Sequence, residues 1–449
     1  MNHKVIDCSL KSILQVTIPL MISMMSVFLM LLIDRVMLAS YSIDSMNAAI
    51  MSGNFVCIFA FMFTALANTA EIFVGQYNGS KQYNKLAAPV WQMIYMSFAT
   101  LVISLPIAYF SDHINMLPHY YLEDGVAYQK ILMYFVLTQP LRVALAAFFV
   151  GQGRTKIIIL SVAVGALLNI ALDYALIFGI KDIIPSMGCK GAAIATVIAE
   201  CAQIVILATV FFSEKNREIY RTFENRRFNL KLSGDCFKIG LPLALENCVS
   251  MVAWYLVQAA ISHTSKDAAT IYNIGINVYL FFLFIGEGAN KAVAAICSNM
   301  IGRGDLESVE KTRKIFVAIS VFFGGIMVLP LALYPLKILE ILGSFFEDIS
   351  ALHSDIIKVF YIVVFDVVLE TLLLSHWGIL IAGGDSKYAA IAYQVCLWTF
   401  VIIPTILLYY ANALTSVPFI FLLMGGWLIT TQLLLYRRYK SMKWYNKLV

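Results

Sequence analysis

The chain lacks the local patterns of a soluble enzyme. It contains no GxxxxGK[ST] phosphate-binding loop and no HExxH zinc motif, so it carries neither an ATPase of its own nor a zinc peptidase built on those motifs. Charged residues are only 13% of the 449 residues, and no stretch between the apolar runs is long enough for a soluble catalytic domain. We therefore expect a protein that is not an enzyme and that uses no cofactor.

The eight cysteines show no CxxC pair and no other paired spacing. Most of them lie within apolar runs, which is typical of small core residues and indicates neither disulfides nor metal ligands. Examples are Cys57, Cys201, Cys248 and Cys396.

Apolar residues, in contrast, are abundant. They make up 61% of the chain, and the mean hydropathy is +0.81. Runs of about 18–28 apolar residues predict about twelve membrane-spanning helices, because a helix satisfies its own backbone hydrogen bonds in lipid. The short alternating segments of a β-barrel do not occur. The predicted spans are 12–37, 49–73, 88–110, 128–150, 157–180, 190–213, 238–261, 270–299, 313–338, 355–382, 388–410 and 416–436. Prolines within them that predict bends are Pro19, Pro140, Pro242 and Pro404.

The distribution of basic residues predicts the orientation of these spans. The two ends and the even-numbered loops together hold 23 of the 32 Lys and Arg, and the odd-numbered loops hold six. By the positive-inside rule both ends are cytoplasmic. The first apolar run has no cleavage site after it, so we expect a retained helix in a prokaryotic cytoplasmic (inner) membrane. The net charge of +5 follows from this topology and indicates no nucleic-acid partner.

The chain repeats itself once. The longest polar interruption, 213–238, divides the spans six and six, which predicts lobes at 1–213 and 238–449 joined by a cytoplasmic linker at 214–237. The step along the chain from Pro19 to Pro242 is the same as the step from Gly79 to Gly302. GQGRTK from Gly151 and AGGDSK from Ala382 end corresponding helices. A repeat without inversion predicts two six-helix bundles related by an axis along the membrane normal, and favours an alternating-access transporter over a membrane enzyme.

Two carboxylates lie deep within the first-lobe spans. Asp34 and Asp173 fall at similar depth in the outer half of the bilayer, counting about 1.5 Å per residue. Such residues are costly in lipid and mark ion or substrate pathways. Asn169 is one turn before Asp173, and Thr196 begins the next span on the same side. These four side chains could hold a proton, because close carboxylates repel, or could ligate Na⁺ through their oxygens. Pairing of Asp34 with the adjacent Arg35 is the plainer alternative.

The second lobe carries its own embedded charges, which we treat as candidates for cation or substrate binding. Asp366 and Glu370 share one helix face, and Glu287 and Lys291 are spaced to form an internal pair. A self-neutralising structural network is the alternative. The candidates are Glu246, Glu287, Lys291, Asp366 and Glu370. For Glu71, near the end of its span, we favour a solvated or paired role.

Several stretches resemble the multidrug and toxic compound extrusion (MATE) transporters over nearly the whole chain. They are LLIDRVMLAS around Asp34, GQYNGSKQYNK, residues 151–179 with the Asn-x-x-x-Asp element, GAAIAT at 191–196, GLPLAL at 240–245 and residues 365–387. The resemblance implies a twelve-helix secondary exporter of small organic, often cationic compounds, driven by inward H⁺ or Na⁺. It matches Asp34, Asn169, Asp173 and Thr196 to the family's N-lobe cation site, and Asp366 to a functional helix 10 aspartate. We expect a monomer.

This chain departs from the family pattern at two places. Arg35 stands where a small or polar residue is more common, and Glu246 lies one turn before the family's glutamate, where this chain has Ser250. A lipid or lipid-linked oligosaccharide flippase of related architecture is an alternative, left open by Arg142 and Lys291. A membrane enzyme acting on lipids would need an interfacial acidic cluster, for which only Asp112, Glu123 and Asp124 are available.

Overall fold

The computed structural model describes residues 7–114, 122–181, 183–343, 350–414, 416–445 and 448. Within these ranges helices make up the regular structure, apart from one isolated β-bridge between Ile180 and Ile184. The predicted cytoplasmic ends rest partly on Lys4 and Lys447, which lie outside these ranges. The all-α prediction is confirmed.

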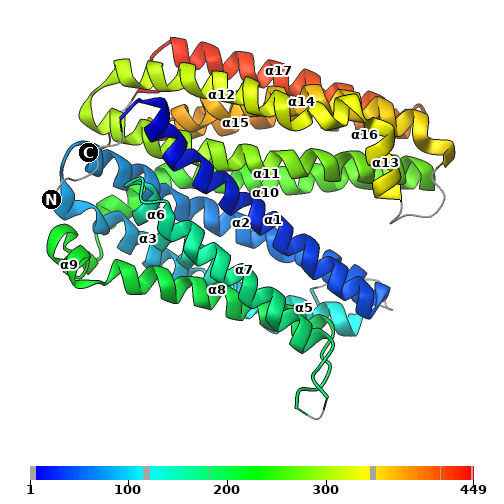
Figure 1. The fold of residues 1–449 in the computed structure, drawn as a ribbon, viewed down its shortest axis with the longest axis horizontal. Helices are drawn as coiled ribbons and strands as arrows, with labels where there is room; N and C mark the ends of the chain where they lie inside the picture. Colours follow the sequence, from blue (N-terminus) through cyan, green and yellow to red (C-terminus); the bar gives the residue numbers. More distant parts are fainter. Residues whose placement is uncertain are drawn as a thin grey trace.

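Two bundles of helices make up the molecule (Figure 1). The first contains α1 (Leu10–Tyr41), α2 (Ile43–Gly79), α3 (Ala87–Ala99), α4 (Leu101–Tyr109), α5 (Leu122–Tyr134), α6 (Thr138–Val150), α7 (Lys156–Ile177) and α8 (Cys189–Phe211). The second contains α10 (Leu230–Thr264), α11 (Lys266–Arg303), α12 (Leu306–Leu333), α13 (Pro335–Gly343), α14 (His353–Ala382), α15 (Ser386–Leu397), a π-helical turn (Trp398–Ile402), α16 (Ile403–Tyr410) and α17 (Val417–Lys440). Helix α9 (Glu214–Tyr220) lies between them in sequence.

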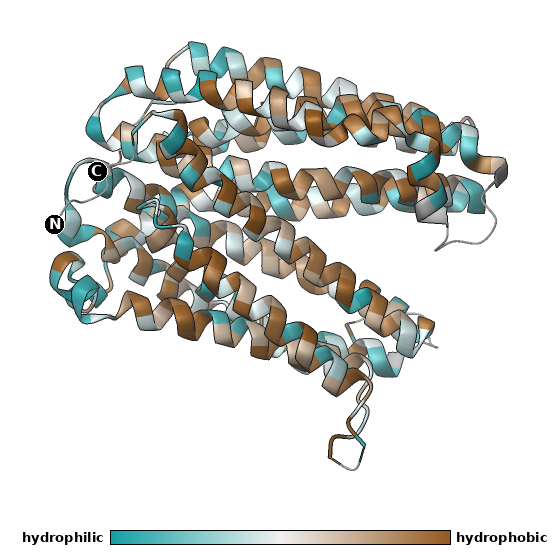
Figure 2. Ribbon diagram, viewed as in Figure 1, coloured by the Kyte–Doolittle hydropathy of each residue, from teal (hydrophilic) through white to brown (hydrophobic). Residues whose placement is uncertain are grey.

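These helices supply the predicted spans. Among the described residues nine helical segments are long and apolar enough to cross a membrane, and the bent pair α5–α6 makes a tenth. Helices α12 and α14, of 28 and 30 residues, take the places of the other two. Figure 2 shows apolar colouring along the bundles and hydrophilic colouring gathered toward their ends, as expected for a protein that crosses a bilayer.

The repeat is visible in the backbone. Ser42 separates helices α1 and α2, and Ser265 separates α10 and α11, at the same offset that relates Gly79 to Gly302. Both serines have extended backbone (φ −162° and −164°), and each hydroxyl caps the following helix by accepting from the amide three residues on. A side-chain oxygen at this position satisfies an amide that has no partner within the helix. The same local chemistry thus breaks the chain at the same point of both lobes.

The linker folds against the first lobe. Trp91 Nε1 donates to the carbonyl of Thr222 at 2.6 Å, and Gln92 Nε2 to that of Arg227 at 3.1 Å. Helix α10 then begins at Leu230, because Asn229 accepts from the amide of Leu232 at 3.0 Å and caps it. The polar segment therefore contributes the first two turns of α10 in addition to a connection.

Two of the four prolines coincide with a helix defect. Pro140 follows the break at 135–137, where α5 and α6 meet at 41°. Pro404 follows the π-helical turn. A proline ring clashes with the carbonyl four residues earlier, and these breaks relieve that clash. Pro19 and Pro242 lie within uninterrupted helices.

The lobes meet at the end of the molecule that holds α9 and both chain ends, and they diverge from there (Figure 1). Helices α2 and α11 cross there at two glycines. A Cβ on Gly79 would lie 1.9 Å from the carbonyl oxygen of Asn299, and a Cβ on Gly302 would lie 2.2 Å from that of Gln76. The offset of the repeat converts each of these contacts into the other, so the crossing lies on the pseudo-twofold axis.

Reciprocal hydrogen bonds hold the same crossing. Gln76 in α2 donates through Nε2 to the carbonyl of Ala382 at the end of α14 (2.9 Å). Asn299 in α11 donates through Nδ2 to the carbonyl of Gly151 after α6 (2.7 Å). Each lobe thus inserts one amide side chain into the glycine-containing turn of the other.

Candidate functional site

Asp34 and Asp173 come together in the first lobe. Asp34 lies on α1 and is 8% exposed, while Asp173 lies on α7 and is fully buried. Their carboxyl groups lie close enough to share a hydrogen bond. Such a contact requires a proton on one of them, because an ionised carboxylate is only an acceptor. Within the described residues Asp34 Oδ1 and both Asp173 oxygens are buried, and no group that carries its own proton donates to them.

Asn169 and Thr196 differ in what they offer this pair. Asn169 is fully buried one turn from Asp173, and neither its Oδ1 nor its Nδ2 has a partner in the described part of the chain. The Thr196 hydroxyl donates to the carbonyl of Ala192 in its own helix at 3.0 Å. Only the lone pairs of its oxygen are therefore available to a cation. In the described ranges no group of three His, Cys, Asp or Glu side chains is arranged to hold a metal ion. A cation here would have two carboxylates and an amide oxygen as its main ligands.

The surroundings of the pair include one residue that we did not anticipate. Tyr128 on α5 interacts electrostatically with both Asp34 and Asp173. Arg35 is exposed and forms no ion pair within 4 Å among the described residues, although it contributes to the electrostatic environment of Asp34. The Asp34 side chain is therefore not neutralised by direct contact with its neighbour.

In the second lobe Asp366 and Glu370 occupy the buried side of α14. Glu370 accepts from the hydroxyl of Tyr279 on α11 at 3.1 Å. Asp366 is fully buried, and neither of its oxygens has a partner in the described part of the protein. Helix α17 approaches it closely, since a Cβ on Gly425 would lie 2.9 Å from Asp366 Oδ1.

Glu246 lies between this acidic group and a groove. Its Oε1 accepts from Ser250 at 2.8 Å and lies 3.3 Å from Gln394 Nε2 on α15. It also interacts electrostatically with Glu287 and Glu370. The groove between α10 and α15 has a volume of about 520 Å³ and apolar walls, with Lys238 and Lys387 also along it. Among the C-lobe candidates, Glu246 is thus the one that lines this groove.

Glu287 and Lys291 do not form the internal pair that their spacing allows. Glu287 instead accepts from Asn290 at 3.2 Å. Lys291 makes no hydrogen bond or ion pair within the described ranges, and interacts at longer range with Glu71, Arg142 and Glu287. Helices α2, α6 and α11 therefore bring charges of both lobes together.

The sequence interpretation did not single out Glu200. It is buried on α8, accepts a hydrogen bond from the Thr138 hydroxyl, and interacts electrostatically with Arg142. Its position within the predicted span 190–213 is the same signal that identified Asp34. For Tyr128 the sequence offers no comparable signal, because tyrosines are common near membrane surfaces.

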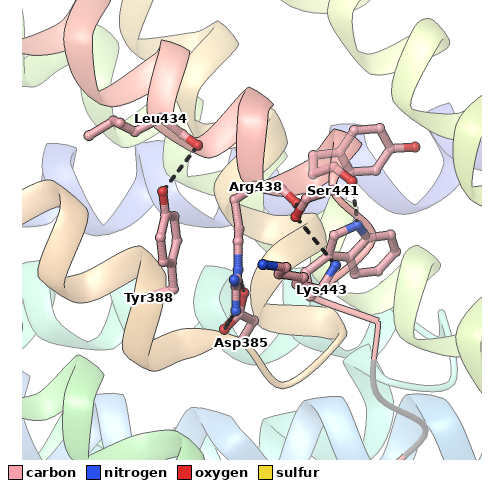
Figure 3. Close-up of polar contacts among 8 residues, drawn as sticks. Asp385, Tyr388, Leu434, Arg438, Ser441 and Lys443 are labelled. Atoms are coloured by element: carbon pink, nitrogen blue, oxygen red, sulfur yellow. Dashed lines mark hydrogen bonds and ion pairs between the residues drawn. The ribbon is translucent and has the colours of Figure 1, made fainter.

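The end of the second lobe nearest the crossing is fixed by an ion pair (Figure 3). Arg438 on α17 donates to both oxygens of Asp385 at 2.6 and 3.2 Å, and its guanidinium lies 4.6 Å from the centroid of the Tyr388 ring. Tyr388 reaches Leu434 at 3.5 Å, and Ser441 caps the end of α17 by donating to the Arg438 carbonyl. The glycine-containing turn that receives Gln76 is thereby held in place.

Two bacterial proteins illustrate the similarity in sequence. The chain is 23% identical over 358 residues to the "Probable multidrug resistance protein NorM" of Thermotoga maritima, covering 78% of this chain and 76% of that protein. It is 24% identical over 325 residues to the "Multidrug resistance protein MdtK" of Yersinia enterocolitica, covering 69% and 68%.

Solved structures agree on the fold. One described as MATE in the straight conformation superimposes with a TM-score of 0.86 at 15% identity, covering 97% of both chains. A MOP superfamily transporter from Pyrococcus furiosus, whose title reports a binding pocket of reverse polarity, superimposes with 0.83 at 16% identity, covering 98% and 96%. These likenesses confirm the twelve-helix arrangement in two related bundles.

A family profile described as MatE matches residues 19–175 and 242–407, one segment in each lobe. The two segments cover most of the chain and include both acidic groups. Membership of a transporter family agrees with the prediction that the protein is not an enzyme. The chain is therefore an integral membrane protein that belongs to the MatE family of transporters.

Proposed function

We propose that this protein is a secondary active exporter of small organic compounds, often cations, in exchange for H⁺ or Na⁺. The observation that carries the proposal is the contact of Asp34 and Asp173, two buried carboxyl groups on different helices with oxygens that have no other described partner. The names of the relatives support multidrug export. Net acidity among the buried side chains favours cationic cargo.

The pair suits an ion switch. One bound H⁺ or Na⁺ cancels the repulsion of two carboxylates and favours close packing of α1 on α7. Loss of the ion would favour their separation. Coupling arises if the cargo binds the ion-free arrangement more tightly than the ion-loaded one, since linkage between the two ligands is reciprocal. Asn169 would supply a further oxygen in the Na⁺ case.

Cargo would bind between the lobes, where the C-lobe acids Glu246, Glu287, Asp366 and Glu370 and the aromatic Tyr279 are available. Carboxylates and aromatic faces both attract organic cations. Alternating access would then require the α2–α11 crossing, with its reciprocal Gln76 and Asn299 hydrogen bonds, to open on the cytoplasmic side. We place both chain ends in the cytoplasm, the protein in a prokaryotic inner membrane, and the working unit as a monomer.

Transport in proteoliposomes tests the proposal. Vesicles loaded with the cation rhodamine 6G receive either a pH gradient or a Na⁺ gradient, and dye movement is followed by fluorescence. We expect one of the two gradients to drive transport. Asp34→Asn and Asp173→Asn should each reduce the rate of dye transport to that of vesicles without protein. Asp44→Asn, an exposed carboxylate at the start of α2, is the control. Wild-type rates in both variants would refute the site, and lipid movement without dye transport would support the flippase alternative.

A further inference from the structure

Helices α2, α6 and α11 converge on the crossing and place a group of charges just beyond it. Asn299 contacts the carbonyl of Gly151 at 2.7 Å, which fixes α11 and α6 at the same level. Lys291 lies eight residues before Asn299, and Arg142 nine residues before Gly151. At about 1.5 Å per residue, both basic residues lie about 12–14 Å from the contact, at the same depth.

The two basic side chains come from opposite lobes. They are electrostatic neighbours, and each is only half-buried. Glu71 and Glu287 lie within electrostatic range of Lys291, and Glu200 within range of Arg142. None of these carboxylates is within 4 Å of either basic group in the described ranges. The arrangement is a cluster of acidic and basic side chains that form no direct ion pairs with one another in the described ranges.

One nitrogen of the Arg142 guanidinium in particular is left without a partner in the described part of the chain. Arg142 Nε is buried and makes no hydrogen bond within the described residues. A buried donor without an acceptor is costly, and the cost is greater for a charged group. Two like charges near each other at the interface of the lobes add repulsion. A carboxylate placed between them would remove both penalties, and arginine binds a carboxylate through two parallel hydrogen bonds.

We propose that Arg142 and Lys291 form an anion-binding pair that receives the acid group of a zwitterionic cargo. This rests on the proposed export function and names a substrate class for it. The cationic part of such a compound would face the C-lobe acids Glu246, Glu287 and Glu370, which are electrostatic neighbours of one another. Since the pair is shared between the lobes, it holds the acid group only while the lobes keep this relative position.

A matched pair of dyes tests the proposal. Rhodamine 6G is an ester and a plain cation, and rhodamine 19 is the same molecule with a free carboxylate. Equilibrium binding of each dye to the purified full-length protein is measured by fluorescence anisotropy. In Arg142→Gln and in Lys291→Gln we expect binding of the acid to weaken about tenfold or more, with binding of the ester nearly unchanged. Lys231→Gln, an exposed lysine of α10 that lies outside the groove, should leave both dyes unaffected.

The outcomes separate this inference from the function on which it rests. If the variants weaken both dyes by the same factor, or if wild-type protein binds the ester and not the acid, the anion-binding pair is refuted even when the ester is exported. If the variants lose affinity for rhodamine 19 but not for rhodamine 6G, and neither dye is transported under any gradient, the export function is refuted and the binding site stands. Arg142→Lys keeps the charge and loses the paired hydrogen bonds, so intermediate binding of the acid is expected should Arg142→Gln not fold.

Discussion

The two lobes carry buried acids in different arrangements, although their backbones repeat with a constant offset along the chain. In the first lobe the acids are on two helices, α1 and α7, and contact each other. In the second lobe Asp366 and Glu370 are on one helix, and Glu370 already accepts from Tyr279. A charge shared by two helices can move one relative to the other when it is neutralised. The C-lobe acids Glu246, Glu287 and Glu370 lie on three helices and interact only at longer range, so they can attract a ligand without sharing one ion between two helices.

This contrast assigns the two lobes different tasks. The first lobe would bind the coupling ion, and the second would bind cargo. The predictions below compare equivalent or contrasting positions of the two lobes, and they run from the largest expected effect to the smallest.

The largest difference in gradient-driven dye transport is expected between Asp173→Asn and Asp366→Asn. The first removes a carboxyl group that shares an ion between helices, so gradient-driven dye transport should fall to background, a loss of about 100-fold or more. The second removes one of several acids near the cargo, and we expect a loss of about tenfold or less, seen mainly in dye affinity. Initial rates at several dye concentrations distinguish the two effects. Equal losses of maximal rate would contradict the division of tasks.

Next are the glycines at the crossing. Gly79→Ala and Gly302→Ala each place a methyl group about 2 Å from a carbonyl oxygen of the other lobe, so both should open the contact to similar extents, at a cost of about 1–3 kcal/mol. Cys297, fully buried on α11, should then react faster with maleimide, as measured by peptide mass spectrometry. Gly234→Ala in α10, with no atom within 4 Å of its Cβ position, is the control. An increase in only one of the two variants would show that the crossing is not symmetric.

A smaller effect, on thermal stability, is expected at the two turns whose carbonyls accept hydrogen bonds from Gln76 and Asn299. In the second lobe Arg438 forms an ion pair with Asp385, whereas in the first lobe Arg154 donates to the neutral Asn216 at 2.9 Å. Arg438→Gln leaves a mostly buried carboxylate without its cation and should cost about 2 kcal/mol. Arg154→Gln should cost about 1 kcal/mol or less. Thermal unfolding in detergent measures both, and a reversed order would contradict the comparison.

The smallest effect concerns two left-handed residues at equivalent positions of the repeat. Gly304 has φ +77°, and Lys81 has φ +61°. Gly304→Ala should lower stability by about 1 kcal/mol, because a Cβ is disfavoured in this conformation. Lys81→Gly should raise it by at most about 0.5 kcal/mol, since glycine also gains freedom in the unfolded chain. Melting temperatures that change in the same direction in both variants would refute this explanation.

Much of the fold could be predicted, because it depends on local composition. Apolar runs located the spans, and Gly79 and Gly302 indicated the repeat that Ser42 and Ser265 display. The start of α10 at Leu230 was hidden, since charged residues there lowered the hydropathy while Asn229 supplied a cap. The break before Pro140 and the π-helical turn before Pro404 could not be predicted, because the sequence does not show how a helix relieves the clash between a proline ring and the preceding turn.

The candidate site was predictable only in part. Asp34 and Asp173 are conspicuous within apolar runs, and so is Glu200, to which the same reasoning was not applied. The direct contact of Asp34 with Asp173 depends on how α1 packs against α7, which no local pattern specifies. Spacing allowed Glu287 and Lys291 to pair, but Asn290 binds Glu287 instead. Residue separation limits what can touch, and tertiary packing selects among the possibilities.

The most direct test of the central claim is the equilibrium affinity of the purified protein for rhodamine 6G over a range of pH and Na⁺ concentration. We predict that affinity falls as the concentration of the coupling ion rises, and that Asp34→Asn and Asp173→Asn bind the dye with an affinity independent of both ions. Variants that bind the dye and retain the wild-type ion dependence would show that another group couples ion and cargo.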